Sequence, residues 1–183
     1  MRGSRKTTRD HAETRLTSLH RANAADLLRF IGRRVDTPED AADVLAETFL
    51  VAWRRIQRLP SSDTEARMWM YGIAKHTISN WNRSVHRRNA LSDSLREQLR
   101  HAPRATNEPV SSSALDVQRA LADLSPSHRE LTILVHWDGF TLAEAGAILG
   151  LPEATARSRY YKAKQILRQA LITDAASAAA SFR

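Results

Sequence analysis

Residues 141–160 read TLAEAGAILGLPEATARSRY, and this stretch decides the fold of the C-terminal half of the chain. Thr141 and Glu144 have the spacing of a capping box, in which a hydroxyl and a carboxylate satisfy each other's backbone donors at a helix start. Gly150 ends this short helix because glycine allows the left-handed turn. Gly146 permits close contact with the helix that follows. The pattern predicts a helix-turn-helix whose second helix enters the major groove of DNA.

The second helix of this motif, expected over residues 153–171, is basic. Its cationic side chains are Arg157, Arg159, Lys162, Lys164 and Arg168. An ordinary helical hairpin with a solvated basic face is the alternative for a helix pair taken alone. The whole chain carries 28 Lys and Arg against 20 Asp and Glu, a formal net charge of +8, which suits an anionic partner. Charge alone leaves nucleic acid and an acidic membrane surface open.

Upstream of the motif, helical periodicity resumes at Ala114 and restarts after Ser125-Pro126, a predicted N-cap and first-turn pair. Asp138-Gly139 ends that helix. Between residues 89 and 113 the periodicity fades and two prolines and a serine run appear. This composition predicts a flexible linker that contains one short helix around residues 92–101.

Three helices are predicted in the N-terminal half. The first spans about residues 12–34, the second follows an N-cap at Thr37 and runs to about Arg58, and Asp63 or Thr64 caps a third that runs to about residue 88. Apolar residues at helical spacing predict one buried stripe on each helix. The stripes consist of Leu16, Leu19, Asn23, Leu27, Phe30, Ile31, Val44, Leu45, Phe49, Ala52, Trp53, Ile56, Trp69, Met70, Ile73, Ala74, Ile78 and Trp81.

The third helix also carries basic charge with no carboxylate between its cations. These cations are Arg67, Lys75, Arg83, Arg87 and Arg88. A surface helix that needed only solubility would mix the two signs of charge, so this helix favours contact with a polyanion. For Trp69 and Trp81 a core position is favoured over stacking on bases, because both lie on the apolar stripe.

The predicted fold class is therefore all-α, with two small helical domains joined by a flexible linker, and no apolar alternation is long enough to predict a strand. We expect the following organisation of the chain: a disordered basic arm at 1–11, the first domain at 12–88, the linker at 89–113, the helix-turn-helix domain at 114–171 and a disordered tail at 172–183.

Several function classes are disfavoured by composition. Cysteine is absent, which removes thiol chemistry and fits a reducing cytoplasm, where we expect the protein to act. The seven histidines form no metal-ligand pattern, and no nucleophile, base and acid constellation is visible, so we expect no metal, no cofactor and no enzymatic activity. No run approaches the ~20 apolar residues of a membrane span, and no secretory signal is recognisable, so membrane insertion is not expected.

Two stretches of the N-terminal half resemble the extracytoplasmic-function class of bacterial RNA polymerase sigma factors. Residues 39–49, EDAADVLAETF, followed by Ala52-Trp53, are similar to the polymerase-binding helix of region two in that family. Residues 69–76, WMYGIAKH, with Asn80, are similar to its promoter-melting helix.

The C-terminal half carries the same resemblance. Residues 124–126, LSP, with Arg129-Glu130, and then residues 141–151 and 155–159, are similar to region four of the family. The order and separation of the motifs match, and the resemblance covers the chain from about residue 16 to residue 171.

The resemblance implies a promoter-specific transcription initiation factor that binds core RNA polymerase, recognises the minus-thirty-five and minus-ten elements, and helps melt DNA. Its implied partners are core polymerase and promoter DNA, with an anti-sigma factor as a further candidate. The residues expected to bind polymerase are Asp43, Ala46, Glu47, Leu50 and Arg54. From spacing alone, a solvated helix face is the favoured interpretation of these residues.

For the minus-ten element, the loop at 57–65 and the third helix would capture unstacked non-template bases. The expected side chains are Tyr71, Lys75, His76, Asn80, Arg83 and Arg87. For the minus-thirty-five element, residues near the start of the recognition helix reach the groove floor. The expected side chains are Glu153, Thr155, Arg157, Ser158, Arg159, Tyr161 and Lys162.

The sequence departs from the family pattern at several positions. The family commonly has glutamine at position 46, isoleucine and alanine at positions 145 and 146, glycine at 154 and valine at 156; this chain has Ala46, Ala145, Gly146, Ala154 and Ala156. We expect the smaller side chains to weaken packing in the helix-turn-helix by roughly 1 kcal/mol per methyl group. His76 and Asn80 stand where the family prefers asparagine and aspartate.

Two other functions remain open from sequence. One is a helix-turn-helix transcription regulator whose N-terminal half senses a ligand or dimerises. The other is a helical adaptor or decoy that binds polymerase or an anti-sigma factor without recognising promoters.

Overall fold

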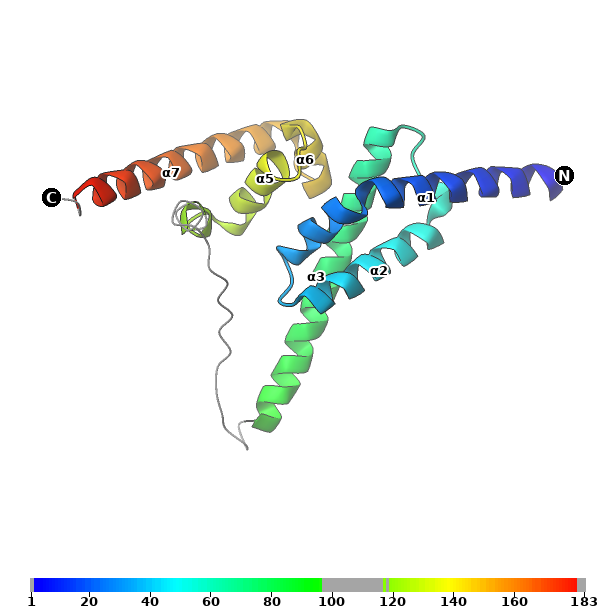
Figure 1. Cartoon of the computed structure of the whole chain (residues 1–183), viewed down its shortest axis with the longest axis horizontal. Coiled ribbons are helices and arrows are strands. Elements are labelled where there is room, and N and C mark those ends of the chain that lie inside the picture. The colour runs from blue at the N-terminus through cyan, green and yellow to red at the C-terminus, as the bar shows by residue number, and fades with distance from the viewer. Residues whose placement is uncertain (1, 97–116, 118, 181–183) are drawn as a thin grey trace. The chain divides into compact units, whose positions relative to one another are not determined.

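The computed structural model describes residues 2–96, 117 and 119–180, and describes side chains for 11–88, 117 and 119–172. The chain divides into two compact units, Met1–Ala102 and Pro103–Arg183. Over the described residues every regular element is a helix and no strand occurs (Figure 1). The predicted class, two helical domains, is confirmed.

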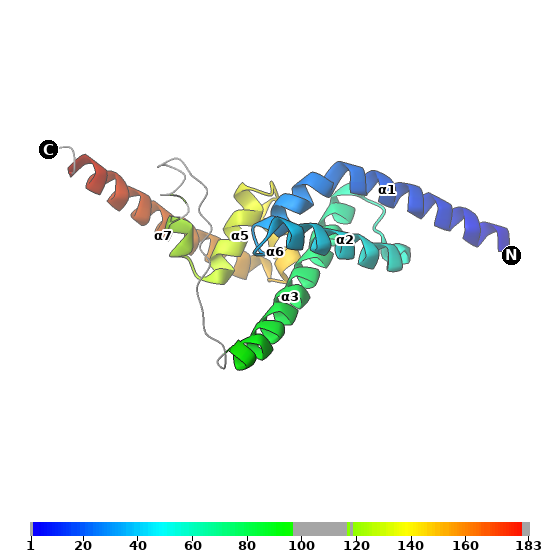
Figure 2. The same ribbon diagram turned by 60° about the horizontal axis from the view of Figure 1, so that its bottom comes forward.

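The first unit is a bundle of three α-helices, α1 (Arg2–Gly32), α2 (Pro38–Arg54) and α3 (Asp63–Arg96), with the short 3₁₀-helix η1 (Ile56–Arg58) after α2. Each of the three long helices packs against the other two. In Figures 1 and 2, α1 and α2 lie side by side and cross the N-terminal half of α3. The C-terminal half of α3 therefore extends beyond the bundle.

The core of the first unit forms where the predicted apolar stripes of its three helices meet. Leu27, Phe30 and Ile31 of α1 are fully buried, as are Val44 of α2 and Met70 of α3. Burying each such side chain contributes roughly 1.5–3 kcal/mol, so these positions account for much of the cohesion between the three helices.

The helix ends show how local sequence shapes this unit. Thr37 caps α2 as predicted, because its hydroxyl accepts the backbone N–H of Asp40 at 3.0 Å. At the start of α3 it is the hydroxyl of Ser62, rather than Asp63 or Thr64, that accepts the N–H of Glu65, at 3.4 Å. The expected second helix to residue 58 is broken at its end, where η1 replaces the last α-helical turn.

Three helices are longer than expected. The first begins at Arg2, within the segment expected as a disordered arm, and α3 runs to Arg96. The end of α3 covers the start of the short helix expected at 92–101, and residues 97–101 lie outside the described residues. The last helix, α7 (Glu153–Ala180), continues into the segment expected as a disordered tail. Alanine, the strongest helix former, dominates that end of the chain.

The second unit contains α5 (Pro126–His136), α6 (Leu142–Leu149) and α7, and each of these helices packs against the other two. Residues 117 and 119–122 are also helical. Arg129 of α5 ties this segment down, because its guanidinium donates to the carbonyls of Leu121 at 2.7 Å and of Leu124 at 3.1 Å. Cationic groups at a helix C-terminus satisfy carbonyls that lack an intrahelical partner.

The turn between α6 and α7 confirms the predicted helix-turn-helix. Thr141 and Glu144 form the complete capping box, with Thr141 N–H donating to the Glu144 carboxylate at 2.8 Å. Gly150 has φ +69°, the left-handed conformation that ends α6.

Gly139, with φ +68°, ends the preceding turn after α5 in the same way. The serine that precedes α5 is different, because the Ser125 side chain makes no cap hydrogen bond.

Gly150→Ala is expected to destabilise the second unit by about 1–2 kcal/mol, since an alanine side chain is strained at positive φ. Gly72→Ala is the matched contrast, because Gly72 is helical and an added Cβ would meet nothing within 4 Å. That substitution should stabilise α3 by about 0.5–1 kcal/mol. Amide hydrogen exchange of the full chain measures the stability of each unit separately. Unchanged exchange in α6 and α7 of the Gly150→Ala variant would contradict the strained-turn argument.

Candidate nucleic-acid and polymerase interfaces

The recognition helix α7 presents its predicted side chains to solvent. The exposed ones are Glu153, Arg157, Ser158, Tyr161 and Lys162, whereas Thr155 and Arg159 are half-buried. Arg157 forms an ion pair with Glu153 one turn earlier. Because both side chains are about two-thirds exposed, this pair contributes little to stability and can be exchanged for other partners.

The small residues Gly146 and Ala156 bring α6 and α7 close together. Both are buried, and a Cβ added to Gly146 would lie 3.1 Å from the Cβ of Ala156, tighter than most contacts in proteins. An added methyl group at position 146 would therefore be crowded, and the expectation that the smaller residues weaken packing stays a prediction. Glycine on one helix is matched by a close approach of the other, so no methyl-sized void is left between them.

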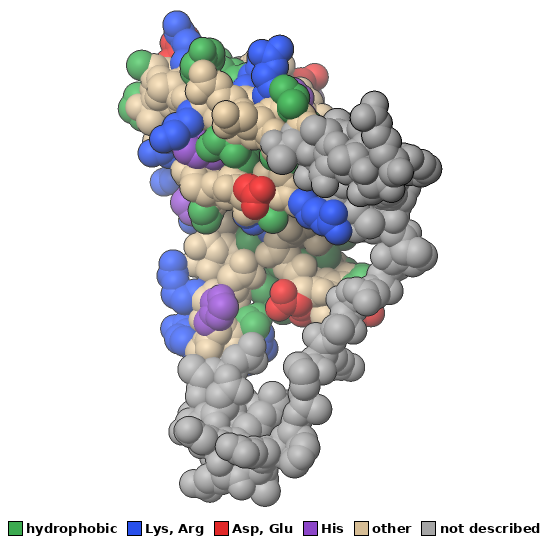
Figure 3. Space-filling view, turned by 90° about the vertical axis from the view of Figure 1, so that its left-hand side faces the viewer, with side chains coloured by type: hydrophobic (Ala, Val, Ile, Leu, Met, Phe, Trp, Pro, Cys, Tyr) green, Lys and Arg blue, Asp and Glu red, His purple; other side chains and the backbone are tan. Residues whose placement is uncertain are grey.

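The basic face of α3 is a second cationic surface. His76, Asn80, Arg83 and Arg87 are exposed, and their spacing of four, three and four residues places them on one side of the helix. Lys75 is half-buried beside them. Figure 3 shows Lys and Arg side chains at several places on the visible face, where acidic side chains are also present. A one-signed helix face of this kind suits the backbone of a nucleic acid.

Tyr71 is not part of that surface, and its assignment as a DNA contact is wrong. The side chain has no exposed area and its ring packs edge to face on Phe30, with centroids 4.9 Å apart. Because α3 packs against both α1 and α2, its buried arc is wider than one stripe and includes this tyrosine. Trp69 and Trp81, expected in the core, are half-buried.

The exposed face of α2 carries all five residues predicted to bind polymerase. Asp43, Ala46, Glu47, Leu50 and Arg54 are exposed, with the Glu47 carboxylate 3.8 Å from the Arg54 guanidinium. Trp53 was predicted to line the inner face, and this is wrong. Its side chain is 43% exposed beside Leu50, which is 50% exposed. The face is thus amphipathic, with an apolar patch of Leu50 and Trp53.

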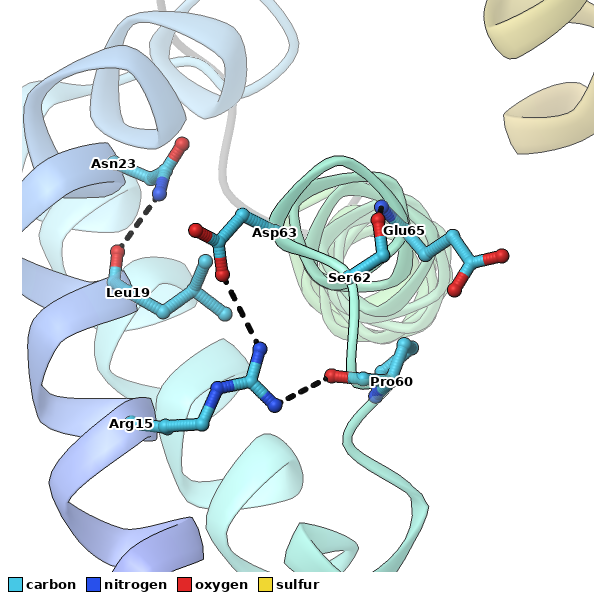
Figure 4. Close-up of polar contacts among 7 residues, drawn as sticks. All are labelled: Arg15, Leu19, Asn23, Pro60, Ser62, Asp63 and Glu65. Carbon is cyan, nitrogen blue, oxygen red and sulfur yellow. Dashed lines mark hydrogen bonds and ion pairs between the residues drawn. The ribbon is translucent and has the colours of Figure 1, made fainter.

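Sequence reasoning missed a cleft between α1, the loop after η1 and the start of α3. The cleft has a volume of about 570 Å³ and is lined by both polar and apolar side chains. Its lining includes Arg15, Asn23, Asp63, Thr64 and Arg67. Figure 4 shows Arg15 reaching from α1 to the loop and to Asp63.

The one sequence signal for this cleft was a polar residue within the apolar stripe of α1. That residue, Asn23, is 93% buried and donates through its Nδ2 to the carbonyl of Leu19 at 2.9 Å. The acceptor of this hydrogen bond lies in the same helix, so the Asn23 Nδ2 group is satisfied without a partner from another helix.

Within the described ranges, no three His, Asp or Glu side chains gather into a metal-binding group. The described helices include none that is long and apolar enough to cross a membrane.

Comparison with known proteins matches both units. The Sigma-70 region 2 family matches residues 19–89, and the Sigma-70, region 4 family matches residues 114–167. The ECF RNA polymerase sigma factor SigL of Mycobacterium tuberculosis is 30% identical over 159 residues, which cover 85% of this chain and 88% of that protein. SigC of the same species, also an ECF sigma factor, is 33% identical over 165 residues, covering 87% and 83%.

Two solved structures share the fold. The sigma factor RpoE from Bartonella quintana, in complex with the anti-sigma factor NepR, has a TM-score of 0.62 at 23% identity and covers 88% of this chain and 97% of that one. CnrH, in complex with the cytosolic domain of CnrY, has a TM-score of 0.60 at 19% identity, covering 91% and 96%.

The two family matches fall in order on the three-helix bundle and on the helix-turn-helix, and the identity with SigL and SigC extends over most of both chains. The chain therefore belongs to the extracytoplasmic-function (ECF) family of bacterial RNA polymerase sigma factors.

Proposed function

We propose that this protein directs core RNA polymerase to specific promoters, through the exposed face of α2 for polymerase, α7 for the minus-thirty-five element and α3 for the minus-ten element. The observation that carries the proposal is the presence of two exposed basic helix faces, one in each unit. A simple helix-turn-helix regulator needs only one of them. The proposal includes no catalytic activity, and the site of action is the polymerase inside the cell.

In duplex recognition, the start of α7 enters the major groove. Arg157 and Glu153 are the side chains able to read bases, because arginine donates to guanine and glutamate accepts from cytosine. Their exposed ion pair opens at little cost. Arg159 and Lys162 hold phosphates and fix the register of the helix on the duplex.

In promoter opening, the protein must offset a few kcal/mol for each base that leaves the stack. The loop after η1 and the cleft beside it receive an unstacked non-template base, and Arg83 and Arg87 of α3 hold the phosphates of the single strand. The cleft volume of about 570 Å³ is ample for one nucleobase.

The decisive experiment is reconstitution of the full chain with core polymerase, followed by mapping of transcript starts on genomic fragments. We expect starts that share two sequence elements, one for each unit. Transcripts without a shared upstream element would refute duplex recognition by α7. Binding to DNA without any polymerase-dependent transcript would favour the helix-turn-helix regulator, and binding to polymerase alone would favour the adaptor.

The double substitution Arg83→Ala and Arg87→Ala should lower open-complex formation on linear duplex several-fold, because two phosphate contacts to the opened strand are lost. The slope of log affinity against log salt should flatten by about 0.7 for each lost contact on single-stranded DNA. A template with a pre-melted bubble should restore much of the activity. An equal defect on duplex and on bubble would show that this face of α3 does not act in melting.

We further propose an anti-sigma factor as an inhibitory partner. RpoE and CnrH, which share the fold, were solved with an anti-sigma factor and with the cytosolic domain of CnrY, respectively. Such a partner would block initiation by covering the exposed face of α2 or of α7. Isolation of the tagged full chain under conditions of low activity, with a bound protein that suppresses transcription in the reconstituted system, would support this.

A further inference from the structure

Arg15 connects two segments that are far apart in the sequence. Its Nη1 donates to the carbonyl of Pro60 at 2.8 Å, and its Nη2 donates to the carboxylate of Asp63 at 3.2 Å (Figure 4). The first acceptor lies in the loop after η1 and the second at the first residue of α3. One planar guanidinium thus fixes the loop and the helix start relative to α1.

We propose that Arg15 is a positioning residue for base selection at the minus-ten element. By holding the loop at 59–62 against α1, it sets the shape of the cleft that it lines, without itself reading the base. The proposal rests on the proposed function of that loop in receiving an unstacked base. Arg15 precedes the segment that matches the region 2 family, which begins at residue 19.

The two contacts of Arg15 differ in strength. The Asp63 side chain is 98% exposed, so its ion pair with Arg15 is screened by solvent and contributes little. The Pro60 carbonyl is partly buried, and a charge-assisted hydrogen bond there is roughly twice as strong as a neutral one. The contact with the Pro60 carbonyl is therefore the one that positions the loop.

The conformation of the loop is restricted, so the contact with Arg15 is enough to fix its position. Proline fixes its own φ and restricts the residue before it to extended conformations, and Leu59 has φ −62° and ψ 119°. The N–H of Leu59 donates to the carbonyl of Ile56 at 3.1 Å, which fixes the start of the loop on η1. A stiff segment held at its start and at the Pro60 carbonyl has little freedom left between them.

The competing role for Arg15 is direct contact with a DNA phosphate, and lysine separates the two roles. Lysine supplies the same charge to a phosphate, but it is a hydrated point donor and lacks the rigid planar group that directs Nη1 of Arg15 to the Pro60 carbonyl. Arg15→Lys should therefore retain a phosphate contact and lose the positioning.

The experiment uses the full chain with core polymerase and single-stranded oligonucleotides that carry the non-template minus-ten element from the mapped starts. Each base is replaced in turn by the other bases and by an abasic site. We expect Arg15→Ala and Arg15→Lys to reduce discrimination at one position by about tenfold, while affinity for the oligonucleotide abasic at that position changes little. Asp63→Asn should stay close to wild type. Arg21→Ala, which removes an exposed arginine of the same helix, is the matched control.

Amide exchange of free full-length protein supplies a readout that is independent of DNA. Faster exchange at Glu65 and Ala66 in Arg15→Ala and Arg15→Lys, but not in Arg21→Ala, is expected from a released loop. A uniform loss of affinity for all oligonucleotides, restored by lysine, would overturn the proposal in favour of a phosphate contact. If wild type discriminates at no position, the proposed function of the loop fails, and if it discriminates while the Arg15 variants do so equally, only the positioning role fails.

Discussion

Replacing Leu50 and Trp53 together by alanine is expected to weaken binding to core RNA polymerase by about 2–4 kcal/mol, or roughly 30- to 1,000-fold in Kd. Both side chains are large, apolar and about half exposed on one face of α2. A few residues near the centre of an interface carry most of its binding energy, and tryptophan is among the residue types enriched there. The charged residues beside them, Asp43, Glu47 and Arg54, would form a rim that orients the partner.

Leu28→Ala is the matched control for this prediction. Leu28 is 41% exposed, similar to Trp53, but it lies on α1 and not on the proposed polymerase face. Its removal should leave the affinity for polymerase unchanged in a competition assay with labelled sigma factor. Thermal melting of each variant checks that the bundle is intact, and Trp53→Phe should recover part of the affinity because an aromatic side chain is retained. Wild-type affinity in the double variant would mean that this face of α2 is only a solvated surface.

The local signals in the sequence predicted the fold well because each acts within a few residues. The capping box of Thr141 and Glu144 and the left-handed Gly150 are short-range requirements of helix ends, and both are present. The stripe on α1 was also predicted, with Leu16, Leu27 and four others buried or half-buried. Such patterns need no knowledge of the partner that covers them.

The errors arose where burial depends on how many neighbours a helix has. Trp53 follows the half-buried Phe49 by one turn but the exposed Leu50 by three residues, so periodicity alone places it at the margin between two faces. Tyr71 lies at a margin of the apolar stripe of α3. It is buried because α3 packs against two helices. At the margin of an apolar stripe, tertiary packing therefore determines whether a side chain is buried or exposed.

Local patterns did not predict where the cleft lies or what lines it, although Asn23 interrupted the apolar stripe of α1. Its walls come from residues 15–23 and 59–67, which meet only after α1 has packed against the start of α3. A carbonyl such as that of Pro60 carries no sequence signature at all, although it is the acceptor that holds the loop. Site features made from backbone atoms and long-range contacts need the structure.

Arg157→Ala is expected to cost about 1–3 kcal/mol in binding of the polymerase complex to the upstream duplex, and to relax preference at particular base pairs. The side chain is exposed at the start of α7, where helix-turn-helix proteins place their base contacts. Its ion pair with Glu153 holds the guanidinium near the helix start in the free protein. Arg157→Lys should relax the preference as well, because lysine keeps the charge but not the bidentate geometry.

Arg168→Ala separates base reading from general attraction to DNA. Arg168 is exposed on the same helix, three turns further from its start, and its loss removes the same charge. We expect that substitution to weaken binding to all upstream sequences alike, with a salt slope reduced by about one unit if Arg168 holds a phosphate. Affinity measured against duplexes with each upstream base pair replaced distinguishes the two effects. A uniform loss in Arg157→Ala, with every base-pair preference intact, would make Arg157 a phosphate contact and leave base reading to other residues at the start of α7.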